Sequence, residues 1–269
     1  MPRTTQAPLP SPEIAAAAAS ARIFAGTSGW AYPTWKPVFY PASTPAKKFL
    51  EFYSTQLSSV EVNYTFRALP TTKMLEDWLA ATQPFFRFSF KAPQRITHIK
   101  RLANCAEDVA FLLSTLEPVR QAAKLGLILF QLPPNLKADA TRLATFLEAP
   151  ALRAAGAPPI AFEFRHETWF SEEIYTILRN NNAALCIAES DDFATPEVHT
   201  ATTHTSFRLR RTGAYSPEEI ASFVDHFLTL AQNRDVYIYF KHEDEPSGAL
   251  NAVSFLQGIA SHAQKAGSG

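Results

Sequence analysis

The sequence of 269 residues predicts a single TIM-like (β/α)8 barrel over residues 22–260. Eight short runs rich in β-branched and aromatic residues recur along the chain, and most are followed by a helical pattern. No linker divides the chain. No Gly-rich phosphate-binding fingerprint follows the first run, so a doubly wound nucleotide-binding sheet fits less well.

The expected strands are residues 22–27, 58–63, 86–91, 125–132, 160–165, 184–189, 205–210 and 235–242. Helical patterns cover residues 45–57, 71–82, 106–123, 139–148, 171–181, 217–232 and about 248–260. Ser216, Pro217 and Glu219 form a capping box with proline in the first helical position, which predicts a helix start. Residues 190–204 show no clear helical pattern, so we expect the helix after the sixth strand to be degenerate.

The ends of the chain and its composition predict which segments are flexible, where the protein resides and which partners its charge attracts. We expect residues 1–21 to be a flexible Pro/Ala-rich leader and residues 261–269 a flexible tail. No apolar run approaches the roughly 18 residues that span a bilayer, and two cysteines suit a reduced protein, so we expect a soluble, cytoplasmic chain. Lys plus Arg equals Asp plus Glu at 25 each, so no global charge attracts nucleic acid or an anionic membrane.

Most of the strands alternate apolar and polar residues instead of reading as continuous apolar runs. In one of them, Phe162 and Phe164 alternate with Glu163 and Arg165. With a period of two, we expect the Phe/Val positions to face the helices and the polar positions to line the barrel. The polar positions concentrate at the C-terminal strand ends, where such barrels place their sites. The alternative is an inert network of ion pairs that fills the interior.

Carboxylates and cations share the expected inward positions. Glu61 and Glu163 could act as general acid and base, or they could simply neutralise nearby cations. The cations are the more consistent signal, because their surplus over Glu61, Glu163 and Glu189 suits a planar anion such as carboxylate or phosphate. The expected anion-binding cations are Lys91, Arg165, Arg208, Arg210 and Lys241.

Further candidates follow other strand ends. His98 and His166 could shuttle a proton near neutral pH. Trp30 lies in the Gly turn "TSGW", which would carry its indole into the mouth to stack on a ligand, unless the aromatic residues there only plug the rim. No tight metal-ligand spacing occurs, so we expect no metal site. The remaining expected ligand contacts are Asn63, Gln131 and His242.

Seven stretches carry a family likeness: "GTSGWAYPTW", "EVNYTFRALP", "FKAPQRITHIKRL", "LFQLPP", "EFRHETW", "FRLR" and "YIYFKHEDEPSGALNA". In this order, from about residue 22 to 258, the chain resembles the YecE-like proteins, domain of unknown function 72. The resemblance implies a TIM-like barrel, in agreement with the strand count, and a pattern of site residues, but no reaction. Arg67 stands where the family commonly has Tyr, and Arg210 where it often has His, so a mechanism that needs that His would not carry over.

Together these observations predict a locally cationic pocket at the C-terminal mouth for a small anionic ligand, namely a phosphorylated or acidic sugar or a nucleotide. The expected chemistry is hydrolysis or isomerisation by acid/base catalysis. One alternative is a non-catalytic ligand-binding barrel. Another is a single-stranded nucleic-acid-binding protein, although the neutral chain makes this less favoured. Its phosphate contacts would be Lys91, Arg95, Lys100, Arg101 and Arg211. Neither a cofactor nor an oligomeric state follows from the sequence.

Overall fold

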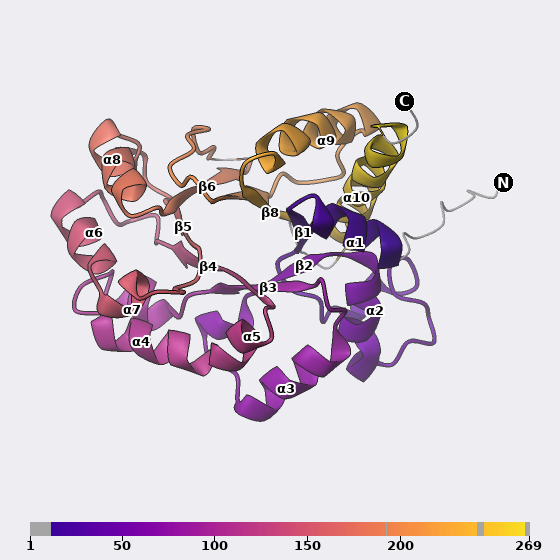
Figure 1. Cartoon of the computed structure of the whole chain (residues 1–269), viewed down its shortest axis with the longest axis horizontal. Helices are drawn as coiled ribbons and strands as arrows, with labels where there is room; N and C mark the ends of the chain where they lie inside the picture. Colours follow the sequence, from indigo (N-terminus) through magenta and orange to yellow (C-terminus); the bar gives the residue numbers. More distant parts are fainter. Residues whose placement is uncertain (1–11, 192, 241–244, 267–269) are drawn as a thin grey trace.

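A computed structural model describes residues 12–191, 193–240 and 245–266, in which helices surround eight parallel strands (Figure 1). The expected TIM-like barrel is confirmed, and each strand ends within two residues of its expected position. The strands are β1 (Ile23–Thr27), β2 (Ser59–Val62), β3 (Arg87–Lys91), β4 (Leu125–Gln131), β5 (Ile160–Glu163), β6 (Ala184–Glu189), β7 (His204–Leu209) and β8 (Asp235–Phe240).

The helices follow the expected pattern with local differences. The helix expected over 106–123 is two helices, α4 and α5, and Pro118 stands in the first turn of the second. The capping box at Ser216 is confirmed, and the described part of residues 190–204 contains no helix. A short helix, α7 (Pro150–Arg153), was not expected. The others are α2 (Phe49–Gln56), α3 (Thr72–Ala81), α4 (Ala106–Thr115), α5 (Glu117–Gln121), α6 (Ala140–Leu147), α8 (Glu172–Asn180), α9 (Pro217–Ala231) and α10 (Ser247–Ala266).

Side chains close the barrel between β1 and β2. Hydrogen-bonded neighbours run from β1 through β8 and back to β2, which leaves β1 and β2 as the seam. The hydroxyl of Tyr53 accepts from the Thr27 N–H at 2.8 Å and donates to the Ser59 carbonyl at 3.1 Å. A Cβ on Gly26 would lie 1.8 Å from that carbonyl oxygen, so only glycine allows the two strands to approach this closely.

The alternating strand pattern has the expected consequence. Phe162 and Phe164 belong to the large core between the strands and the helices. The opposite positions form a smaller cluster inside the barrel, which includes Leu129 and Tyr239. The hydroxyl of Tyr239 also bonds to Ser89 at 2.6 Å, so the lower interior is a packed core and not a pore.

Glu189 is an exception to the expected inward positions. Cys186 lies in the interior cluster and Ile187 in the outer core, so the alternation of β6 turns Glu189 outward. There its carboxylate accepts a hydrogen bond from the hydroxyl of Tyr215 at 2.9 Å. The expectation that Glu189 faces the mouth was wrong, because β6 is apolar on both faces and its pattern could not fix the inward side.

Helices occupy two segments that were expected to be flexible. Residues 12–20 form helix α1 (Pro12–Ser20), which packs against α10 (Figure 1). Ala15 and Ala18 are 0% exposed in this contact. The expected flexible leader was therefore wrong for residues 12–20, and the expected tail was wrong for residues 261–266, which continue α10. Alanine has the highest helix propensity, and its small side chain allows close helix packing.

Within the described ranges, no helix has the combined length and apolar character of a membrane-spanning segment.

The packing of α1 is testable with two neighbouring alanines. Ala18 is buried and Ala17 is exposed on the same helix. Ala18→Glu places an unpaired carboxylate in the contact and is expected to destabilise the protein by about 2–4 kcal/mol. Ala17→Glu is expected to change stability by less than about 0.5 kcal/mol. Denaturant unfolding measures both, and equal stability of the two variants would contradict a packed α1.

Candidate functional site

Three charged side chains meet inside the C-terminal end of the barrel. Glu61 lies in β2, Glu163 ends β5 and Arg208 lies in β7. Arg208 donates from Nη1 to Oε2 of Glu163 at 2.5 Å, and from Nη2 to Oε1 of Glu61 at 2.7 Å. All three side chains are only 1–2% exposed, so one guanidinium joins two buried carboxylates. We call these three residues the buried charge cluster.

Neutral donors complete the bonding of the two carboxylates. Gln131, the last residue of β4, donates from Nε2 to Oε2 of Glu163 at 2.8 Å. Ser28, just after β1, donates from its hydroxyl to Oε1 of Glu61 at 2.8 Å. No hydrogen bond from a described residue reaches the second oxygen of Glu61.

Lys91, Arg165 and Arg210 surround the buried charge cluster, and we call them the rim cations. Arg165 donates from Nε to Oε1 of Glu163 at 3.2 Å. Nη1 of Arg210 is 3.9 Å from the same oxygen, which is too far for a hydrogen bond. Nζ of Lys91 lies 4.3 Å from the centroid of the Phe66 ring, with no hydrogen bond or ion pair to the described residues. Within the described ranges, the charged ends of Lys91 and Arg210 therefore have no hydrogen-bond acceptor.

These charges set the ionisation of the site. Burial raises the pKa of Glu163, but the charges of Arg208 and Arg165 outweigh burial and bring that pKa to about 2. Glu163 is therefore ionised at neutral pH, which argues against its expected role as a proton donor. Burial and the positive charge of Arg208 lower the pKa of Lys91 to about 8. Lys91 thus exchanges a proton closer to neutral pH than an ordinary lysine does.

Positive charge predominates among the described residues at this end of the barrel. The rim cations and Arg208 are four cations against the two carboxylates of Glu61 and Glu163. These described residues carry a net positive charge, although the whole chain has a formal net charge of zero. A partly enclosed site concentrates such a field and attracts anions. Lys241 and His242, which were also expected here, lie outside the described residues.

The two expected proton-shuttling histidines differ in their contacts. The rings of His98 and Phe66 meet edge to face with their centroids 4.9 Å apart, and Lys91 lies over the same phenyl ring. Burial and the charge of Lys91 lower the pKa of His98, so it is neutral at pH 7. The ring of His166 instead accepts from the N–H of Thr168 and caps a 3-10 turn. His166 is not brought to the buried charge cluster by any contact among the described residues.

A cavity of about 250 Å³ lies beside the C-terminal ends of β1 and β2, and Trp78 of α3 forms part of its wall. Gly29 begins its wall with φ +111°, a conformation that favours glycine, and the expected tight turn at "TSGW" is confirmed. Trp30 and Asn63 line the cavity, and Nδ2 of Asn63 donates to the Ser28 carbonyl at 3.3 Å. We call this cavity the aromatic pocket. Its full lining is Gly29, Trp30, Ala31, Tyr32, Val62, Asn63, Tyr64 and Trp78.

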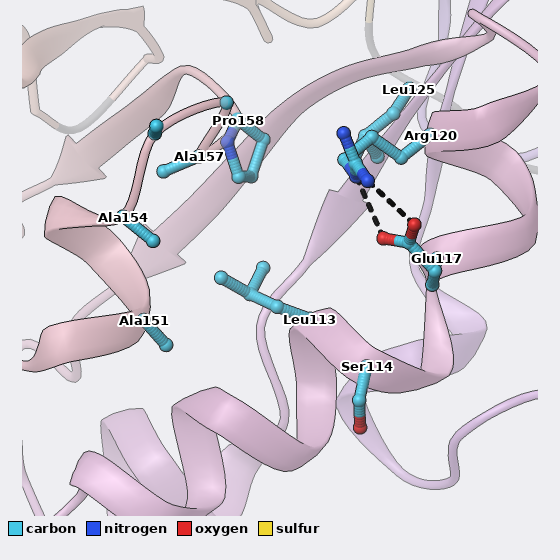
Figure 2. Close-up of a pocket in the computed structure, with 11 residues that line it drawn as sticks. Leu113, Ser114, Glu117, Arg120, Leu125, Ala151, Ala154, Ala157 and Pro158 are labelled. Atoms are coloured by element: carbon cyan, nitrogen blue, oxygen red, sulfur yellow. Dashed lines mark hydrogen bonds and ion pairs between the residues drawn. The ribbon is translucent and has the colours of Figure 1, made fainter.

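A larger cavity of about 430 Å³ lies at the opposite end of the barrel, where β4 begins at Leu125 (Figure 2). Its walls include Leu113 and Pro158, together with several alanines. The guanidinium of Arg120 is bound to both carboxylate oxygens of Glu117 at 2.7 and 2.6 Å. Because this pair is mutually satisfied, the cavity lacks the surplus charge that marks the mouth.

The cations of the nucleic-acid alternative are largely paired with acids. Arg95 and Lys100 both bind Asp108 at 2.6 Å. Arg211 forms a two-point pair with Glu219 at 2.6 and 2.9 Å. These pairs reduce the positive charge available to a phosphate backbone. No group of three potential metal ligands gathers among the residues that the structure describes.

Comparison with known proteins agrees with this architecture. The family model described as "Protein of unknown function DUF72" matches residues 24–268. The chain belongs to this family. A DUF72 family protein from Thermotoga maritima has the same fold with a TM-score of 0.75 and 25% identity, covering 88% of this chain and 99% of that one. A DUF72 family protein from Enterococcus faecalis has a TM-score of 0.73 and 18% identity, covering 88% and 95%.

Curated relatives of this DUF72 chain match over a shorter region. The UPF0759 protein YunF of Bacillus subtilis is 31% identical over 158 residues, which cover 57% of this chain and 54% of the relative. The UPF0759 protein YecE of Escherichia coli is 29% identical over 160 residues, covering 58% and 54%. The matched region thus spans about half the length of these relatives.

Sequence reasoning did not single out several residues of this site in the DUF72 fold. Ser28 bonds to Glu61, but its only signal was its place in the "TSGW" turn. Trp78 lies on α3 in a pattern typical of core packing, and it both packs against the core and lines the aromatic pocket. Tyr64 lies one residue after Asn63 and is 47% exposed. The signal in the sequence was its place as an aromatic residue directly after an expected ligand contact.

Arg208 gives the sharpest test of the buried charge cluster. Arg208→Met removes the cation that joins two buried carboxylates and is expected to destabilise the protein by about 3–5 kcal/mol. Arg210→Met, just beyond the C-terminal end of β7, breaks only a 3.9 Å ion pair. The Arg210→Met variant is expected to lower the free energy of unfolding by less than about 1 kcal/mol. Thermal and denaturant unfolding of both variants measure the difference.

A second comparison separates lost charge balance from lost packing. Adding Glu61→Gln and Glu163→Gln to Arg208→Met removes the stranded negative charges, so most of the lost stability is expected to return. A triple variant no more stable than Arg208→Met would show that the methionine fails for steric reasons. It would contradict the electrostatic account of the cluster.

Proposed function

We propose that the protein binds a small anionic molecule at the C-terminal mouth of its barrel, a phosphorylated or acidic sugar or a nucleotide. The observation that carries this proposal is the surplus of cations there. Arg208 is enclosed by the two carboxylates, so the rim cations are the groups that meet a ligand. An inert network would satisfy its own charges, whereas Lys91 and Arg210 keep donors without hydrogen-bond partners among the described residues.

The types of residue at the rim suit oxyanions. The guanidinium of an arginine presents parallel N–H groups that match a carboxylate or phosphate, and Lys91 adds a compact charge. Arg165 donates to Glu163 from Nε, which orients its side chain, and no hydrogen bond joins its terminal nitrogens to a described residue. In this proposal the buried charge cluster positions the site, and Arg208 acts on the ligand through Glu163 and Arg165.

Acid/base chemistry, as in hydrolysis or isomerisation, is the second part of the proposal. Lys91 supports it, because a pKa of about 8 lies near the pH range in which a group can both give and take protons. The oxygen of Glu61 without a hydrogen bond from the described residues is a candidate proton acceptor. Lys91 and His98 both contact the ring of Phe66. A proton could pass between them only through a ligand or solvent. A binding barrel without turnover is the alternative, and product formation from a bound ligand decides between them.

Anion binding is expected to raise the thermal midpoint. At about 100 times Kd, phosphate or sulfate stabilises the folded protein by about 2.7 kcal/mol through mass action. Arg210→Met and Lys91→Met are each expected to weaken binding about tenfold, because each removes a hydrogen bond to a charged group. Arg120→Met at the opposite cavity is the matched control and is expected to keep the parental affinity. Calorimetric titration provides the dissociation constants.

Two results would contradict anion binding at the mouth. In the first, no tested anion, including phosphate, sulfate and a sugar phosphate, changes the melting midpoint of the parent. In the second, Arg120→Met weakens binding as much as Arg210→Met does.

The ionisation of Lys91 predicts a pH dependence of binding. The lysine is charged below its pKa of about 8 and loses its charge as pH rises through that value. Sulfate does not titrate in this range, so its affinity is expected to fall about tenfold between pH 7 and pH 9.5 as the lysine loses its charge. A bound anion favours the charged lysine and moves the midpoint above 8.

Lys91→Arg is the matched variant for this measurement. An arginine keeps its charge throughout the range, so the variant is expected to bind sulfate with little change from pH 7 to pH 9.5. Equal pH dependence in Lys91→Arg and the parent would show that another group titrates, and it would remove Lys91 from the proposed site.

A further inference from the structure

The aromatic pocket contains a polar atom that has no partner among the described residues. Oδ1 of Asn63 is buried without a hydrogen bond to any of them, while Nδ2 of the same amide donates to the Ser28 carbonyl. A buried acceptor without a donor is unfavourable by about 1–3 kcal/mol, and such atoms are uncommon in folded proteins. A ligand hydroxyl or N–H in the pocket would satisfy this atom.

The aromatic walls favour a particular shape of ligand. Trp30 and Trp78 lie at 86° to each other with ring centroids 5.3 Å apart, so they form a corner and not a parallel slot. Tyr32 and Tyr64 add further ring surface. A flat base gains most between parallel rings, whereas a sugar ring offers a C–H face to one aromatic ring and hydroxyls along its edge. At about 250 Å³ the pocket suits a single ring.

The pocket is connected to the anion-binding end of the barrel. Ser28 donates to Glu61 through its hydroxyl and accepts from Asn63 through its carbonyl. One residue therefore links the buried charge cluster to the open acceptor.

We propose that the aromatic pocket holds the sugar ring of a sugar phosphate or sugar acid whose anionic group lies against the rim cations. This inference rests on the proposed function and adds the class of ligand. One ring hydroxyl donates to Oδ1 of Asn63, and the C–H face of the ring packs against Trp30. Tyr64, at 47% exposure, covers the ring from the solvent side.

Tryptophan fluorescence reports occupancy of this pocket directly. The chain has four tryptophans. Trp35 and Trp169 are 0% exposed and lie in the core, whereas Trp30 and Trp78 line the pocket. Glucose 6-phosphate is expected to change the emission on binding. Inorganic phosphate, which reaches only the rim cations, is expected to raise the melting midpoint without that change.

Two pocket variants and one control complete the test. In the parent, glucose 6-phosphate is expected to bind about tenfold more tightly than inorganic phosphate, equivalent to about 1.4 kcal/mol. Tyr64→Ala and Asn63→Ala are each expected to remove most of that advantage and to leave phosphate affinity unchanged. Phe111→Ala is the matched control, because Phe111 is also an exposed aromatic residue, 66% exposed, but lies on α4 outside the pocket. It is expected to retain the full advantage.

The possible results lead to distinct conclusions. If glucose 6-phosphate and phosphate bind equally and neither changes the emission, the sugar subsite is wrong, while anion binding stands. If no anion binds at all, the proposed function fails and the subsite fails with it. If adenosine monophosphate binds at least about tenfold more tightly than glucose 6-phosphate, and Tyr64→Ala removes that preference, the pocket recognises a base instead of a sugar.

Discussion

The guanidinium of Arg208 allows two carboxylates to be buried inside one end of this barrel. Glu61 and Glu163 approach the barrel axis from β2 and β5, and Arg208 bonds to both from β7. Without that cation, two negative charges in a region of low dielectric would repel each other and lose their hydration. An apolar filling would be at least as stable, so the cluster is better explained by what it positions than by the stability it contributes.

The rim follows from this arrangement. Because Arg208 occupies one oxygen of each carboxylate, Glu163 has an oxygen left to orient Arg165, and the remaining positive charge is not cancelled. The same charges keep Glu163 ionised and bring the pKa of Lys91 to about 8. On the other side of Glu61, Ser28 connects the cluster to the aromatic pocket. One ion-pair arrangement thus links the rim cations to a cavity in which Oδ1 of Asn63 has no partner among the described residues.

Alternation along single strands was enough to predict the fold and much of the site. A period of two assigned Glu163 and Arg208 to the interior, and the structure confirms both. It failed for Glu189, because β6 is apolar on both faces. Pairing across the barrel could not be predicted either, since the partners of Arg208 lie 45 and 147 positions away in the sequence. Arg208 was expected to contact a ligand, but because of that pairing it is enclosed by two carboxylates. The aromatic pocket was only partly foreseen, because Trp78 comes from a helix whose pattern resembles ordinary core.

A crystal structure of the protein with glucose 6-phosphate bound tests the central claim most directly. The account predicts a phosphate within hydrogen-bond distance of Lys91 and Arg210, a sugar ring against Trp30, and Arg208 still bonded to both carboxylates. A phosphate that separates Arg208 from Glu163, or one that binds at the opposite cavity beside Arg120, would contradict it.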